Sequence, residues 1–332
     1  MKRALITGIL GQDGTYLARW MIRQGYEVHG LIRKSPDQER DRIAARFSES
    51  DRDRLQFHSG SVSEPDLFNR LLGTTSPDEV YHLAGVSDSR QSFLIPEETV
   101  QTITVGSLRL LEACRQTNPK ARIFVASSCE VFGPPEQSPQ TLETPRRPAT
   151  PYGIAKNAMD QFVRIYRDHH GSFVCSGILY NHESPLRPAN YLSSRVAKAV
   201  AEIHAGRSKE LVLGNLDSER DWSDARDFVR GFHLSLQAAT PADYIFASGQ
   251  SRTVADLVEC AFKAAGLDYR EFVRVEQAQT GVVPVRGGLC GDVSATEKSL
   301  GWQRKWSFAE TLADMVQAEI ESRPTIRRTE PD

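Results

Sequence analysis

The stretch RALITGILGQDG, residues 3–14, decides the fold. Its apolar start is typical of a buried strand, and an amphipathic helix is expected directly after it, over residues 14–24. Three glycines between them permit a tight turn, a close approach of the backbone to a pyrophosphate, and close packing of helix on strand. We therefore predict a dinucleotide-binding loop; the alternative is a glycine-rich surface turn. The residues expected at the cofactor are Gly8, Gly11, Gln12, Asp13 and Gly14.

Short apolar runs alternate with longer amphipathic stretches over residues 1–180. Strands that alternate with helices favour right-handed crossovers and an α/β fold with a parallel, doubly wound Rossmann sheet. The expected strands cover residues 3–7, 26–32, 55–58, 79–83, 123–126 and 173–179. The expected helices cover residues 14–24, 64–72, 100–117 and 152–167.

The pattern loosens beyond residue 181. Helices are expected over residues 194–205, 227–237, 253–265 and 308–320, with a strand-like piece at 210–213. We interpret residues 181–320 as a smaller, mostly helical substrate-binding lobe, with the chain crossing back to the first domain around residues 215–250. Residues 321–332 have no apolar period, and a frayed tail is expected there.

Composition narrows the possible partners. The chain of 332 residues has 41 basic and 43 acidic side chains, so no global charge favours nucleic acid or an anionic membrane. No apolar run is long enough to cross a bilayer, and the N-terminus enters a strand without a signal-peptide pattern. The five cysteines have no metal-ligand spacing, so we expect no metal and reduced thiols in a cytoplasmic protein.

The end of the second expected strand indicates the cofactor. The sequence GLIRK, residues 30–34, carries no Asp or Glu. A carboxylate at this position would bind the 2′-hydroxyl of NAD, whereas a guanidinium suits a 2′-phosphate. We therefore expect NADP, with Arg33 as its ligand and residues 1–180 as the NADP-binding domain. The alternative is that Arg33 and Lys34 are only solvated surface charges.

A YxxxK motif opens the expected helix 152–167. Tyr152 and Lys156 are four residues apart and share a helix face, so the ammonium is expected to lower the pKa of the phenol from roughly 10. The phenolate then takes a proton from a sugar hydroxyl as hydride leaves for nicotinamide. The tyrosine and the lysine are accordingly expected to be both catalytic and cofactor-binding.

The segment ASSCEVFG, residues 126–133, closes the fifth expected strand. Ligands of such sheets bind at the carboxyl ends of the strands, so this segment and the YxxxK motif are expected to meet there. Ser128 is expected to hydrogen-bond the hydroxyl that is oxidised. Glu130 is expected to remove the proton next to the new ketone. The alternative for Glu130 is a structural carboxylate that satisfies backbone donors.

Six stretches resemble the GDP-mannose 4,6-dehydratase family, a branch of the extended short-chain dehydrogenases. The strings GQDG (11–14) and NHESP (181–185) are the most diagnostic. The six stretches are residues 4–18, 128–130, 152 with 156, 177–185, 213–222 and 301–302.

The resemblance implies roles for single residues. Ser128 sits where the family has a catalytic Thr, Glu130 matches its base, and Tyr152 with Lys156 matches its redox pair. Further residues expected at the cofactor are Leu83, Ala84, Ser87, His182 and Arg187. Residues expected at the nucleotide sugar are Ser87, Ser128, Asn181, Arg195, Arg220 and Arg286.

Three segments depart from the family pattern. GSV at residues 60–62 replaces Gly-Asp-Leu, which removes a carboxylate expected near the adenine end. GVSD at 85–88 replaces Ala-Gln-Ser-His, and VVPVRG at 282–287 replaces an Arg-Pro-x-Glu segment. Because these segments choose sugar and base, another GDP-hexose or a GDP-heptose fits nearly as well as GDP-mannose.

The resemblance implies an internal redox cycle. Tyr152 takes the O4 proton as hydride leaves C4, Glu130 removes the C5 proton, water leaves from C6, and the hydride returns to C6. The rivals are an NADPH-dependent 4-keto-sugar reductase, a 4-epimerase and a catalytically inactive NADP-binding scaffold.

A homodimer through helices 100–117 and 152–167, or a homotetramer through the cofactor-binding loop, is also expected.

Overall fold

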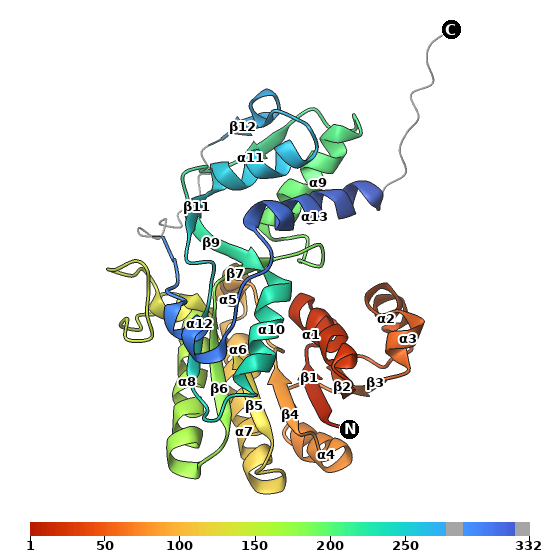
Figure 1. The fold of residues 1–332 in the computed structure, drawn as a ribbon, viewed down its shortest axis with the longest axis vertical. Helices are drawn as coiled ribbons and strands as arrows, with labels where there is room; N and C mark the ends of the chain where they lie inside the picture. The colour runs from red at the N-terminus through yellow and green to blue at the C-terminus, as the bar shows by residue number, and fades with distance from the viewer. Residues whose placement is uncertain (277–287, 323–332) are drawn as a thin grey trace.

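The computed structural model describes residues 1–276 and 288–322. Figure 1 shows an α/β unit with a second, smaller unit above the carboxyl ends of its strands. The central sheet has seven strands in the order β10-β6-β5-β4-β1-β2-β3, and all the neighbouring pairs are parallel. These strands are β1 (Arg3–Thr7), β2 (Glu27–Ile32), β3 (Leu55–Ser59), β4 (Glu79–His82), β5 (Arg122–Ala126), β6 (Val174–Leu179) and β10 (Asp243–Phe246). The doubly wound parallel sheet is thereby confirmed.

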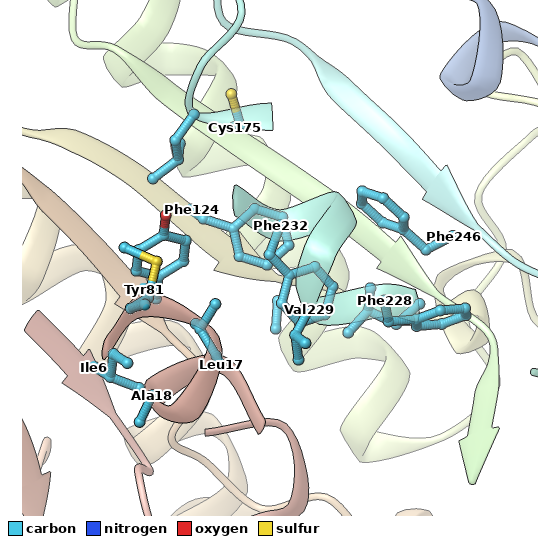
Figure 2. Close-up of a cluster of buried hydrophobic side chains, with 14 of the residues drawn as sticks. Ile6, Leu17, Ala18, Tyr81, Phe124, Cys175, Phe228, Val229, Phe232 and Phe246 are labelled. Carbon is cyan, nitrogen blue, oxygen red and sulfur yellow. The ribbon is translucent and has the colours of Figure 1, made fainter. Parts of the chain in front are cut away.

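Helices cover both faces of this sheet. One face packs against α1 (Gln12–Arg23) and α10 (Ala225–Ser235), and side chains of both helices meet the sheet at Phe124 and Tyr81 (Figure 2). The other face packs against α4 (Leu67–Thr75), α7 (Gly106–Thr117) and α8 (Pro151–His170). Two short helices, α2 (Arg40–Arg46) and α3 (Glu49–Arg52), lie between β2 and β3, and α5 (Ser89–Leu94) follows β4.

The glycine loop lets α1 start directly on the end of β1. Gly8 has a φ of +74°, which favours glycine, and a Cβ on Gly14 would stand 2.3 Å from the carbonyl oxygen of Gly8. Close packing of helix on strand therefore requires the absence of a side chain at position 14. The predicted strand–turn–helix is confirmed at residues 3–23.

The expected helix 100–117 is not one regular helix. The chain forms α6 (Pro96–Val100), a π-helical turn (Gln101–Val105) and then α7 without a break. Such turns insert one extra residue into the helical ladder, a feature that hydrophobic periodicity does not reveal. Within this segment, the Thr104 hydroxyl donates 2.9 Å to the carbonyl oxygen of Ala155 on α8.

The smaller unit has a core of its own. Strands β7 (Asn181–Glu183), β9 (Glu219–Asp224) and β11 (Ser251–Thr253) form one sheet, and β8 (Leu211–Leu213) pairs with β12 (Val273–Val275). Their apolar side chains pack with α9 (Leu192–His204), α11 (Val254–Ala264) and α13 (Phe308–Glu321).

The chain returns from this unit to the central sheet. Strand β10 pairs with β6, α10 packs on α1, and α12 (Ser294–Leu300) packs on β10. The sequence pattern identified α10 but did not indicate β10, because its four residues lack a long apolar run.

Several expected absences concern the described part of the chain. In residues 1–276 and 288–322 no helix combines the length and apolarity of a bilayer span, and no three His, Cys, Asp or Glu side chains are grouped as metal ligands. The five cysteines form no disulfide. Residues 323–332 of the expected tail lie outside the described residues.

Candidate active site

A groove of about 680 Å³ lies at the carboxyl ends of β1, β2, β3 and β4. The turns that follow these strands form its walls, as the crossover rule for open sheets predicts. Predicted cofactor residues that line it are Gly8, Gly11, Gln12, Asp13, Gly14, Arg33, Leu83, Ala84, Ser87 and Arg187.

The floor of the groove suits a pyrophosphate. The N-cap of α1 is Gly11, which has no side chain to accept hydrogen bonds from the first turn of the helix. The amides of that turn therefore face the groove with the positive end of the helix dipole. Arg187 lines the same groove and adds a permanent positive charge. The residues present thus fit a dinucleotide.

The GQDG and NHESP strings form one hydrogen-bonded network. Gln12 accepts a hydrogen bond from Ser184 at 2.7 Å and donates to the backbone oxygen of His182 at 3.0 Å. The His182 ring lies 2.7 Å from the carbonyl oxygen of Tyr180 and 2.9 Å from the carboxylate of Asp13. Burial acts to raise the pKa of Asp13, but the charge and hydrogen bond of His182 outweigh it, so the pKa is lowered. The network fixes the start of α1 against β7.

The end of the groove beside β2 carries charges of both signs. Arg33 and Lys34 are exposed and line it. Glu39 also lines it, although it lies seven residues beyond the end of β2, outside the window where a carboxylate was sought. Its carboxylate is 2.8 Å from the Arg42 guanidinium. Ser61, in the segment that departs from the family pattern, lines the same wall.

The YxxxK pair lies at the first turn of α8. Thr150 caps this helix, and Pro151 at its first position fixes the entry of the chain. The ammonium of Lys156 donates to the carbonyl oxygen of Ala126 at 2.5 Å and lies 5.7 Å from the centre of the Tyr152 ring. The two side chains are therefore brought together at the carboxyl end of β5.

The expected effect of Lys156 on the phenol is wrong for the protein alone. Burial, followed by the charge of Glu130, raises the pKa of Tyr152, and a hydrogen bond with Ser128 opposes them only in part. Burial also lowers the pKa of Lys156 to about 8. The physical reason is that the phenol is partly buried and lies beside a carboxylate, an environment that a sequence motif does not report.

The loop after β5 brings Ser128 and Glu130 to Tyr152. A short 3-10 turn (Cys129–Phe132) follows Ser128 and packs tightly on α8, where a Cβ on Gly153 would stand 2.7 Å from the backbone oxygen of Glu130. The carboxylate of Glu130 accepts hydrogen bonds from Ser89 and Thr150, both at 2.7 Å. The sequence did not indicate this contact of Ser89, because α5 and the loop are far apart in the chain.

The residues expected at the nucleotide sugar are more scattered. Arg220, on β9, is close enough for its charge to act on Cys129 in the loop after β5. Asn181, on β7, pairs with Trp222, two residues after Arg220 on β9. Arg195 is exposed near the start of α9. Arg286 lies outside the described residues.

Fold and site together define a class of protein. A parallel seven-stranded sheet, a glycine loop at the first turn, and Ser, Tyr and Lys side chains at the carboxyl end of β5 are the features of nicotinamide-dependent short-chain dehydrogenases. Comparison with known proteins narrows this class. The chain belongs to the GDP-mannose 4,6 dehydratase family, whose model matches residues 5–315.

Individual relatives resemble almost the whole chain. GDP-mannose 4,6 dehydratase 1 of Arabidopsis thaliana is 36% identical over 329 residues, which cover 96% of this chain and 90% of the relative. GDP-mannose 4,6-dehydratase of Yersinia enterocolitica is 34% identical over 351 residues, which cover 97% and 94%.

Solved structures share the fold. DesIV, a dTDP-glucose 4,6-dehydratase of Streptomyces venezuelae with NAD and TYD bound, has a TM-score of 0.83 at 25% identity over 97% of this chain and 98% of its own. RMD of Pseudomonas aeruginosa, complexed with NADPH, has a TM-score of 0.77 at 21% identity, over 97% of this chain and 100% of its own. At that identity RMD is a likeness of fold alone.

Proposed function

We propose that this protein is a hydro-lyase that converts GDP-mannose, or a related GDP-hexose or GDP-heptose, to its 4-keto-6-deoxy form. The observation that carries the proposal is a carboxylate, Glu130, on the same loop as Ser128 and beside Tyr152. Reduction or epimerisation at C4 needs a proton-transferring phenol but no base for C5. Family membership supports the same reaction.

Four side chains share the chemistry. The Tyr152 oxygen exchanges a proton with O4 of the sugar, and Ser128 donates a hydrogen bond to the same oxygen. Lys156 keeps a positive charge beside the phenol. The Glu130 carboxylate takes the proton from C5, which a ketone at C4 has made acidic, and then protonates the departing C6 hydroxyl. A bound nicotinamide supplies storage for one hydride, so no net reduction of the cofactor is expected.

NADP is the proposed cofactor. Arg33 and Lys34 at the end of β2 support it, because a guanidinium and an ammonium stabilise the extra phosphate. Glu39 is already bound to Arg42. In calorimetric titrations, wild type is expected to bind NADP more tightly than NAD, and Arg33→Ala to lose most of that difference; equal affinity of wild type for both cofactors contradicts the proposal.

The remaining proposals concern organisation. Residues 1–180 bind the cofactor, and the lobe within residues 181–320 binds the nucleotide sugar. The protein is proposed to be cytoplasmic and to form a homo-oligomer. The homo-oligomer is supported by exposed apolar side chains on the helices expected to pair, such as Ile154 and Ile165 on α8. Phe93 and Leu94 on α5 are exposed as well.

The reaction itself is tested by incubating purified holoenzyme with GDP-mannose. Mass spectrometry is expected to find a product lighter by one water, without stoichiometric oxidation of NADPH. A product of unchanged mass indicates an epimerase, and consumption of NADPH with a keto-sugar indicates a reductase. GDP, UDP, CDP and dTDP compared in a thermal-shift series test the base, with the largest stabilisation expected for GDP.

A further inference from the structure

The carboxylate of Glu130 is held by one of its two oxygens. Its Oε2 accepts the hydroxyl protons of both Ser89 and Thr150, at 2.7 Å each. Within residues 1–276 and 288–322 no hydrogen bond reaches its Oε1. One oxygen is therefore anchored, and the other keeps its lone pairs for a proton.

Both donors are fixed by their own surroundings. Thr150 is the N-cap of α8, and its Oγ1 accepts the amide proton of Gly153 at 2.9 Å, so its own proton points to Glu130. Ser89 is the first residue of α5. The Ser92 hydroxyl donates to the backbone oxygen of Ser89 at 2.6 Å and accepts from the backbone amide of Tyr152 at 3.1 Å.

These contacts join the base to the phenol. Helix α5 packs on α8, and Ser92 links the backbone of Ser89 to that of Tyr152. A movement of α5 therefore shifts Glu130 and Tyr152 together. Hydrogen bonds from two hydroxyls to one oxygen fix the orientation of the carboxylate.

We propose that Ser89 and Thr150 are positioning residues, which clamp Oε2 of Glu130 so that Oε1 faces C5 of the sugar. This inference rests on the proposed dehydratase function. The bond between C5 and its hydrogen breaks and the proton goes to Oε1; the electron pair forms the C5–C6 double bond as the C6–O bond breaks, and the proton passes from Oε1 to the departing hydroxyl, which leaves as water. The clamp thus acts on elimination and leaves to Tyr152 the proton exchange at O4 that accompanies hydride transfer from C4.

The test compares variants of the holoenzyme with GDP-mannose as the probe. Ser89→Ala is expected to lower kcat about tenfold at unchanged KM, and Ser89→Ala with Thr150→Val about a hundredfold. Reduced nicotinamide is expected to accumulate on these variants during turnover, seen by its near-ultraviolet absorbance, because oxidation continues while elimination slows. Thr150→Ser keeps the hydroxyl and is expected to restore kcat.

A matched control separates this effect from lost helix capping. Thr253 is the N-cap of α11 and makes the same kind of contact with its helix, far from Glu130. Thr253→Val is expected to lose similar thermal stability and to keep wild-type kcat. The clamp is wrong if Ser89→Ala turns over within twofold of wild type, or if kcat falls without accumulation of reduced cofactor. Failure of the wild type to remove water overturns the proposed function instead.

Discussion

In the proposed mechanism, Glu130 is the base for C5 that transfer of hydride alone does not need. Replacing it by Gln keeps the shape and the hydrogen bond from Ser89 but removes the basic oxygen. Glu130→Gln is expected to lower water elimination at least about a hundredfold, the usual contribution of a general base. Stopped-flow absorbance is expected to show reduced nicotinamide forming on addition of substrate, since oxidation at C4 does not need the carboxylate.

Glu136 offers the control for this substitution. It is an exposed acid six residues further along the same connection, paired with Arg147. Glu136→Gln is expected to retain wild-type turnover. If Glu130→Gln also retained it, Glu130 would have no part in proton abstraction, and its role would be to hold the loop.

Residues in short motifs were predictable at this scale, whereas their surroundings were not. Ser128, Tyr152 and Lys156 belong to local strings whose chemistry follows from residue type and helical spacing. The contact of Ser89 with Glu130 joins positions 41 residues apart and depends on how α5 packs. The raised pKa of Tyr152 likewise arises from burial, which no motif encodes.

At the scale of elements, the entry of α1 depends on Gly14. An Ala there places a Cβ 2.3 Å from the Gly8 oxygen and 2.6 Å from Cα of Ile9, both backbone atoms. Gly14→Ala is expected to cost about 1–3 kcal/mol of unfolding free energy and to weaken cofactor binding. At Gly73 on α4 a Cβ would have no atom within 4 Å, so Gly73→Ala is expected to raise the unfolding free energy by about 0.5–1 kcal/mol.

Urea unfolding measures the stability of Gly14→Ala and Gly73→Ala, and calorimetric titration measures how tightly each variant binds the cofactor. Tight cofactor binding by Gly14→Ala at wild-type stability would mean that the loop relaxes at no cost. The close packing of helix and strand would then not be required for the site.

Helix α8 presents an apolar stripe to solvent. Ile154 and Ile165 are eleven residues apart, which places them on one face of the helix, and both are exposed. Ile165→Lys is expected to shift a homo-oligomer toward monomer in sedimentation velocity, because it places a charge in an apolar interface. Val275→Lys makes the same change on β12 and is expected to leave assembly intact; equal behaviour of both variants contradicts pairing through α8.

At the scale of the whole molecule, buried histidines make stability depend on pH. His82 is enclosed at the end of β4, 3.0 Å from the Thr7 hydroxyl, and burial lowers its pKa to about 3. Below roughly pH 6.5 the unfolded chain therefore binds a proton at His82 that the folded protein does not bind. The free energy of unfolding consequently falls as the pH falls. Burial lowers the pKa values of His29 and His233 in the same direction.

The contribution of His82 is isolated by comparing two proteins at two pH values. Buried aspartates such as Asp160, whose pKa burial raises, oppose the histidines, and their effect cancels in the difference. Asn at position 82 keeps an acceptor for Thr7 and does not titrate. Between about pH 7 and pH 5, His82→Asn is expected to lose roughly 1–2 kcal/mol less unfolding free energy in urea than wild type. Parallel losses would show that His82 takes up its proton in the fold.

Most of the sheet was predictable because its first six strands alternate with long amphipathic helices. Strand β10 was not predictable, since its four residues follow α10, beyond the regular alternation, and are placed in the sheet by pairing with β6. The π-helical turn before α7 was equally hidden, because an inserted residue barely disturbs an apolar period. Long-range pairing and local irregularity thus set the limit of what the sequence pattern reveals.

Strand β10 has a consequence for any attempt to divide the protein. A fragment that stops at residue 180 contains the whole glycine loop, but it loses the partner of β6 along Ser176–Leu179. It also loses Phe232 of α10, whose ring stacks on Phe124 (Figure 2). The fragment would expose an unpaired, apolar strand edge, the arrangement through which sheets join those of other chains. It is expected to aggregate rather than to bind nucleotide as an independent module.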